Sequence, residues 1–98
     1  MSELLSDNDC EKALIGLDGW AYNDVYKNIE KTFSFNNFEA AVTFVQHVTS
    51  ISIELNHYPD IAIGKGGTAK ITSTTNDVNG VTEKDVALAE SIEILVSG

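Results

Sequence analysis

The middle of the chain carries one long helical pattern, and this pattern constrains the fold more than any other feature. Asn36 can cap a helix, Glu39 stands three residues later at the capping-box position, and the pattern continues to about Asn56. Pro59 follows and keeps the chain beyond it extended. A helix with one apolar face has to bury that face against another element. The stripe consists of Phe38, Ala41, Val42, Val45, Val48 and Ser52.

Two short strand patterns precede this helix, over residues 20–22 and 28–35. In the second of them, apolar Ile29, Phe33 and Phe35 alternate with polar residues. The Asn23-Asp24 step between the two segments is typical of a turn, so the segments are predicted to form a hairpin.

Two further strand patterns, residues 60–63 and 68–74, follow the helix. The glycine-rich stretch 64–67 joins them. It lacks the strand–loop–helix setting and spacing of a phosphate-binding loop, so a second hairpin is the better interpretation.

Helical patterns also occupy both ends of the chain. The first begins at the potential cap Ser6 and would end at Gly16 or Gly19, and the last begins at Thr82 with Asp85 at its capping-box position. The order α-β-β-α-β-β-α predicts one α+β domain over residues 1–98, an antiparallel four-stranded sheet with helices packed on one face. The apolar faces are Cys10, Ala13, Leu14 and Leu17 in the first helix, and Val86, Ala89, Ile92 and Leu95 in the last.

Charge and length narrow the range of partners. Fifteen acidic residues against six basic ones give a net charge of −9, which disfavours nucleic acids and anionic membranes. A chain of 98 residues builds only a thin core, and its sheet leaves an open edge, so a homo-oligomer, dimer or tetramer, is expected.

Cys10 is the only cysteine, which excludes an intrachain disulfide and a cysteine-rich metal site. With no secretory signal and no apolar run of about 18 residues, the expected location is the cytoplasm.

Several segments resemble the pterin-4a-carbinolamine dehydratases, also called 4a-hydroxytetrahydrobiopterin dehydratases. Residues 56–60, Asn-His-Tyr-Pro-Asp, are similar to the His-His-Pro active-site motif of that family. Residues 79–85, with Leu88-Ala89 after them, resemble its closing Gly-Leu-Thr-x-x-Asp motif. The resemblance covers nearly the whole chain. Its front half is carried by Gly19-Trp20, residues 29–35, residues 38–41 and Phe44.

The resemblance implies a hydro-lyase that converts 4a-hydroxytetrahydropterin to quinonoid dihydropterin without a metal or another cofactor. His57 matches the first histidine of the pair and Asp85 the acid that opens the last helix, so these two are the candidate catalytic residues. Candidate substrate-binding residues are Tyr58 in place of the second histidine, Pro59, Asn76 in place of a later histidine, and Glu54, one position off the expected acid.

The same residues also have structural interpretations. His57 can be a solvent-exposed histidine, or a helix-terminal one that the dipole of the preceding helix stabilises. Asn76 can be a turn residue, and Asp85 a helix-start acid stabilised by the dipole. Loss of two histidines also fits a weak or inactive family member that binds a protein, as a dimerisation cofactor or a RuBisCO-assembly-type factor. Residues 58–65 resemble those assembly factors. Both hypotheses, enzyme and protein-binding module, follow from the sequence.

Overall fold

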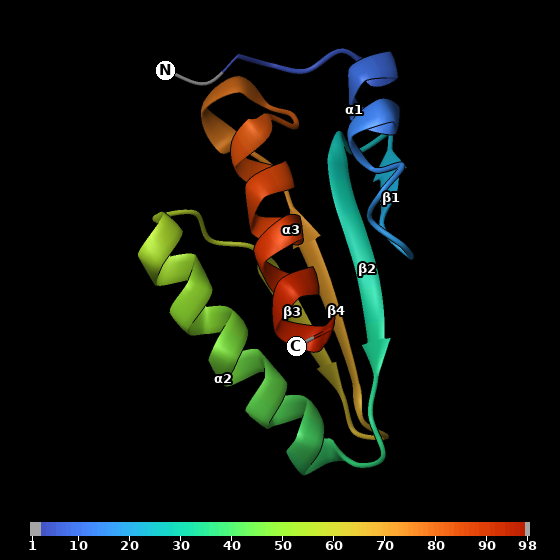
Figure 1. Ribbon diagram of the computed structural model, residues 1–98, viewed down its shortest axis with the longest axis vertical. Helices are drawn as coiled ribbons and strands as arrows, with labels where there is room; N and C mark the ends of the chain where they lie inside the picture. Colours follow the sequence, from blue (N-terminus) through green and yellow to red (C-terminus); the bar gives the residue numbers. More distant parts are fainter. Residues whose placement is uncertain (1–2, 98) are drawn as a thin grey trace.

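The computed structural model describes residues 3–97 and has the element order that the sequence predicts. The four strands form one antiparallel sheet in the order β1-β2-β4-β3 (Figure 1). The α+β class and the order α-β-β-α-β-β-α are therefore confirmed. The elements are α1 (Asp7–Ala13), β1 (Ala21–Asn23), β2 (Asn28–Ser34), α2 (Phe38–Leu55), β3 (Asp60–Gly64), β4 (Thr68–Ser73), the short 3₁₀ helix η1 (Asn76–Val78) and α3 (Glu83–Ser97).

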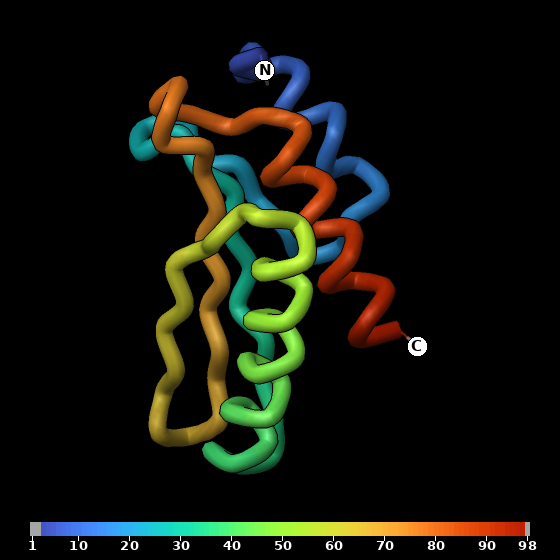
Figure 2. The backbone as a smooth tube through the Cα atoms, turned by 90° about the vertical axis from the view of Figure 1, so that its left-hand side faces the viewer, coloured from blue at the N-terminus to red at the C-terminus, as the bar shows by residue number. Residues whose placement is uncertain are grey.

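The helices cover one face of the sheet, as Figure 2 shows with the strands on one side and α2 and α3 on the other. The strand residues that face the helices are buried: Ile29 and Phe33 in β2, and Ala69, Ile71 and Ser73 in β4. Residues that alternate with them, such as Thr32 and Lys70, are exposed. The core thus lies between the sheet and the helices, as the alternation in the sequence predicts.

The long helix α2 begins one residue later than expected. Asn37, not Asn36, is its cap, because the Asn37 side chain accepts a hydrogen bond from the Ala40 amide at 2.8 Å. The buried face differs as well: it includes Phe44, which the predicted stripe omitted, whereas Phe38 is 45% exposed. Phe44 packs against Phe33 with ring centroids 4.7 Å apart, which joins α2 to the sheet.

The first and last helices begin where the sequence predicts. The Ser6 hydroxyl accepts a hydrogen bond from the Asp9 amide at 3.1 Å, but α1 already ends at Ala13, before Gly16. At the start of α3, Thr82 and Asp85 form the predicted capping box, in which the Asp85 carboxylate accepts from the Thr82 amide at 2.9 Å. None of the helices within residues 3–97 is both long and apolar enough to cross a lipid bilayer.

Candidate active site

The end of α2 brings His57 into the interior. Asn56 adopts a left-handed conformation, φ 53° and ψ 44°, which asparagine tolerates better than most residues. The His57 amide then donates to the Ser52 carbonyl at 3.0 Å, and the chain turns back toward the sheet. Because of this turn only 8% of His57 is exposed. The interpretation of His57 as solvent-exposed is therefore wrong, although the residue does lie at the end of α2, directly after its cap Asn56.

The imidazole meets the second candidate catalytic residue directly. His57 Nε2 lies 2.6 Å from Oδ1 of Asp85, a residue 28 positions later in the first turn of α3. Asp85 is fully buried. Since burying a carboxylate is costly without partners, its surroundings have to compensate.

Four donors surround the Asp85 carboxylate, two at each oxygen. Oδ1 accepts from His57 Nε2 and from the Ser73 hydroxyl at 2.5 Å. Oδ2 accepts from the Thr75 hydroxyl at 2.8 Å and from the Thr82 amide at 2.9 Å. The Thr75 and Thr82 hydroxyls are also hydrogen-bonded to each other, at 2.8 Å. Asp85 is thus not only a helix-start acid: it accepts from β4, from the loop after β4 and from the His57 turn at once.

This geometry assigns different tasks to the two ring nitrogens of His57. A carboxylate that already accepts from Ser73, Thr75 and the Thr82 amide acts as an acceptor toward the imidazole as well, so the tautomer that fits is the one with the proton on Nε2. Within residues 3–97, Nδ1 makes no hydrogen bond. The buried side-chain polar atom without a partner in this part of the chain is Asn28 Oδ1, so Nδ1 is not a buried atom. Nδ1 is therefore accessible to solvent, and in the neutral imidazole it holds a free lone pair.

A cavity of about 280 Å³ lies beside the imidazole. Three predicted site residues line it together: His57 and Tyr58 from the segment before β3, and Asn76 from η1. Tyr58 is 63% exposed and lies at the rim. The other residues of the cavity wall are also polar: Asn56, Thr74, Thr75, Asp77 and Lys84. Polar groups in a wall of this kind can fix the orientation of a small ligand by hydrogen bonds.

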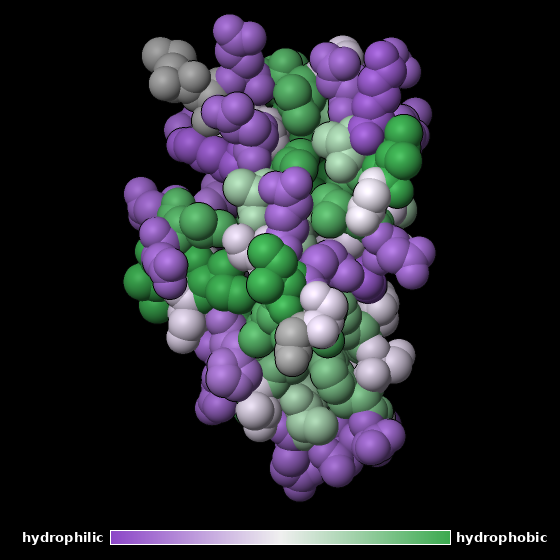
Figure 3. All heavy atoms as spheres, viewed as in Figure 1, coloured by the Kyte–Doolittle hydropathy of each residue, from purple (hydrophilic) through white to green (hydrophobic). Residues whose placement is uncertain are grey.

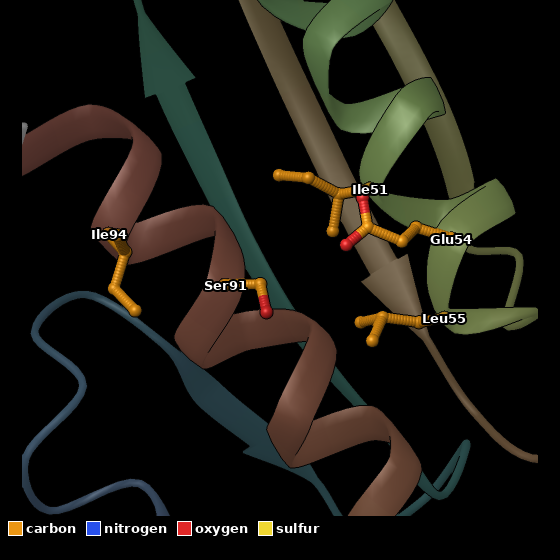
Figure 4. Close-up of a pocket in the computed structure, with 5 residues that line it drawn as sticks. All are labelled: Ile51, Glu54, Leu55, Ser91 and Ile94. Atoms are coloured by element: carbon orange, nitrogen blue, oxygen red, sulfur yellow. The ribbon is translucent and has the colours of Figure 1, made fainter.

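The remaining predicted residues lie outside this wall. Asp85 is behind the imidazole, and Pro59 follows Tyr58 without lining the cavity. Glu54 lines a different hollow of about 170 Å³ between α2 and α3, together with Ile51, Leu55, Ser91 and Ile94 (Figure 4). The acid expected from the family resemblance would stand at position 53. One residue along a helix corresponds to a rotation of about 100°, so Glu54 points in a different direction from a side chain at position 53. The structure does not bring Glu54 to His57.

Apolar side chains surround the hollow that contains Glu54. In Figure 3, hydrophobic residues gather where α2 and α3 lie side by side. Leu55 and Ile94, which line it, are 39% and 72% exposed. The two hollows differ in chemistry, since only the one beside His57 combines a titratable group with a polar wall.

Ser73, Thr75 and Thr82 were not predicted as site residues. Ser73 carried a signal in the sequence, because it occupies an inward position of β4 where Ala69 and Ile71 precede it at intervals of two. A hydroxyl at such a position needs a buried partner. Which partner it finds depends on the packing of α3 over the sheet, and the strand pattern does not contain that information.

Comparisons with known proteins agree with this geometry. Residues 3–95 match the family model described as pterin 4 alpha carbinolamine dehydratase. Two relatives are provisionally named pterin-4-alpha-carbinolamine dehydratase. The protein from Thermosynechococcus vestitus is 36% identical over 95 residues, with 97% of each chain covered. The protein from Rhizobium etli is 38% identical over 92 residues, which cover 94% of this chain and 90% of the relative.

Two solved structures share the fold. The crystal structure of a transcriptional coactivator/pterin dehydratase from Brucella melitensis superposes with a TM-score of 0.87 at 28% identity, over 94% of this chain and 97% of the other. A pterin dehydratase-like RuBisCO assembly factor of the alpha-carboxysome superposes with a TM-score of 0.64 at 20% identity, over 79% of this chain and 88% of the other, a likeness that concerns the fold alone. The match of the family model over residues 3–95, together with relatives that align along almost the whole length, shows that the chain belongs to the pterin-4a-carbinolamine dehydratase family.

Proposed function

We propose that this protein dehydrates 4a-hydroxytetrahydropterins to quinonoid dihydropterins, with His57 as its acid–base group. The observation that carries the proposal is the orientation of one buried imidazole. Its Nε2 is fixed by Asp85 at 2.6 Å, while Nδ1 is open beside a polar cavity. An imidazole exchanges protons near neutral pH, which the reaction needs.

The reaction moves one proton and breaks one C–O bond. His57 Nδ1 takes the N5 proton, the N5 electron pair forms the C4a=N5 double bond, and the 4a-hydroxyl leaves. The hydroxyl takes up a proton from the imidazolium, directly or through water, and departs as water, so the enzyme ends in its starting state. Asp85 stabilises the intermediate imidazolium, since its carboxylate lies against the opposite nitrogen.

The wall of the cavity supplies groups for substrate binding. In this proposal the Asn76 amide hydrogen-bonds the polar edge of the pterin, and the Tyr58 hydroxyl donates to the leaving oxygen at the rim. Pro59 restricts the backbone that presents His57 and Tyr58. Glu54 has no part in this mechanism because it lines the other hollow.

The second candidate function is a protein-binding module, and the composition of the cavity favours it. Among the residues that line the cavity, His57 is the only imidazole, while Tyr58 and Asn76 occupy positions where the family resemblance places histidines. A tyrosine of ordinary pKa is a slow base at neutral pH, and an asparagine does not titrate there. A family member that binds a protein partner, as a dimerisation or assembly factor, would tolerate such changes.

A stopped-flow assay of 4a-hydroxytetrahydropterin dehydration separates the two candidates. The enzyme hypothesis predicts a rate above the uncatalysed reaction that falls by about 10²–10⁴-fold in His57→Ala, or to the uncatalysed rate if that is reached first. His47→Ala is the matched control, because His47 is an exposed residue of α2. Equal rates for the parent protein, His57→Ala and buffer would contradict the proposal and leave the protein-binding module as the remaining candidate.

The proposal also includes a cytoplasmic homo-oligomer. Strand β3 lies at the end of the sheet order and pairs only with β4 among the described residues. Its free edge can add a strand of another copy. Light scattering coupled to size exclusion measures the mass directly, and a monomer of 10.6 kDa at micromolar concentration would contradict this part.

A further inference from the structure

Ser73 occupies a position that the packing of the core alone does not explain. It lies on the inward face of β4, after Ala69 and Ile71, and is 1% exposed. A buried hydroxyl requires a partner, and here the partner is Asp85, whose Oδ1 accepts from the Ser73 hydroxyl at 2.5 Å. The hydroxyl reaches the site from the strand, underneath the carboxylate.

The same carboxylate oxygen also holds the imidazole. Oδ1 of Asp85 accepts from Ser73 and from His57 Nε2, while Oδ2 is occupied by Thr75 and the Thr82 amide. The two donors at Oδ1 therefore share one oxygen. A hydroxyl that hydrogen-bonds a carboxylate disperses part of its negative charge.

We propose that Ser73 is a positioning residue, which fixes the rotation of the Asp85 carboxylate and lowers the charge that Oδ1 presents to His57. The role in turnover rests on the proposed dehydratase function. With Ser73 in place, the imidazolium is stabilised less strongly, so Nδ1 returns its proton and is again available as a base. Without it, Oδ1 would hold the imidazolium more tightly.

Other charged or titratable groups near His57 come from three directions. Tyr58 precedes β3, Asp77 belongs to η1, and Lys84 lies at the start of α3; all three line the cavity together with His57. Asp85 is the charged group on the Nε2 side. Replacement of Ser73 leaves these groups in place, so its effect on His57 is transmitted by Asp85.

The test is an NMR titration of the isotope-labelled 98-residue chain, which contains only two histidines. In Ser73→Ala, the imidazole signals of His57 should keep their protonated positions to higher pH than in the parent. Those of the exposed His47 should not move. Ser52→Ala is the control: it removes another buried hydroxyl, one that bonds only the Val48 carbonyl of its own helix, and should leave the His57 titration unchanged.

In the stopped-flow assay, Ser73→Ala should lower kcat about tenfold with little change in KM, because an imidazolium that Oδ1 holds more tightly returns its proton more slowly. Ser73→Cys, with a similar side chain and a weak donor, should shift the His57 titration in the same direction by a smaller amount, and it replaces the alanine variant if that variant does not fold. An unchanged His57 titration in a folded Ser73 variant would overturn the proposal. The titration needs no turnover, so failure of the dehydratase function and failure of this inference are distinguishable.

Discussion

Asp85→Asn is the substitution whose outcome the geometry of the site determines most fully. An amide has one oxygen and one NH₂ group, so it can face the four donors around position 85 in two orientations. If the NH₂ group faces Thr75 and Thr82, it lies against the Thr82 backbone N–H. Both groups are then donors, and a backbone N–H cannot rotate to avoid the contact. An unpaired buried N–H of this kind costs about 1–3 kcal/mol.

The other orientation turns the NH₂ group toward His57 and Ser73. The Ser73 hydroxyl can rotate to accept, and His57 can accept at Nε2 if its proton moves to Nδ1. The difference of about 1–3 kcal/mol favours this second orientation by roughly 5- to 150-fold. Nδ1 then carries a hydrogen toward the cavity and loses the lone pair that the proposed mechanism uses.

We therefore expect Asp85→Asn to lower kcat by about 10²–10⁴-fold in the dehydration assay while the chain still folds. Chemical shifts of the ring nitrogens report the tautomer, and His57 should change from protonated Nε2 to protonated Nδ1. Asp77→Asn is the control, because it removes an exposed carboxylate from the same cavity wall without touching the pair. An Asp85→Asn protein with the parent's rate and the Nε2 tautomer would refute this reasoning.

Three further predictions concern other parts of the chain. Asn76→His places a second imidazole on the cavity wall and should raise kcat by about tenfold or more in the same assay; an unchanged rate in a folded variant would contradict this prediction. The hydrogen bond from Tyr22 and that from Lys27 hold the pKa of Asp7 below its usual value, so Asp7 stabilises the fold above roughly pH 4 and this contribution disappears as the pH falls. The free energy of unfolding, measured in urea at pH 6 and at pH 3, should therefore fall less between these two pH values in Asp7→Asn than in the parent. Equal decreases in the two proteins would contradict this prediction. Burial raises the pKa of the Cys10 thiol, so alkylation by iodoacetamide at pH 8 should be slow in the folded protein and fast in urea; rapid labelling of the native chain would show that α1 opens readily.

Much of the fold follows from local signals in the sequence. Helix caps and strand alternation depend only on residues a few positions apart. The caps Ser6 and Thr82 therefore predict two of the three helix starts, and the alternation predicts the inward strand faces; together these signals predict the order of elements. The start of α2 differs from the prediction by one residue because Asn36 and Asn37 are both able to cap a helix, and which one does so depends on how the chain leaves β2. Phe44 was missed for a related reason, since a helical pattern with apolar residues on several sides does not show which side the aromatic rings of β2 will meet.

The candidate site could be predicted only in part. The resemblance to the family provided His57 and Asp85, and the structure pairs them. The pattern around Ser73 and Thr75 did not reveal their role, because the hydroxyls meet Asp85 only after β4 and α3 have packed. Glu54 carries a charge one position from the expected acid, but the helical rotation places it in the hollow between α2 and α3. Helix geometry, not residue type, decides that position.

The central claim is that the polar cavity beside His57 receives the pterin. Titration of 7,8-dihydrobiopterin, a stable dihydropterin, into the isotope-labelled protein tests it without requiring turnover. The account predicts that the NMR signals of His57, Tyr58 and Asn76 shift together and saturate, while those of Glu54 and Ile94 in the other hollow do not. Shifts confined to Glu54 and Ile94, or no shift at millimolar ligand, would contradict it.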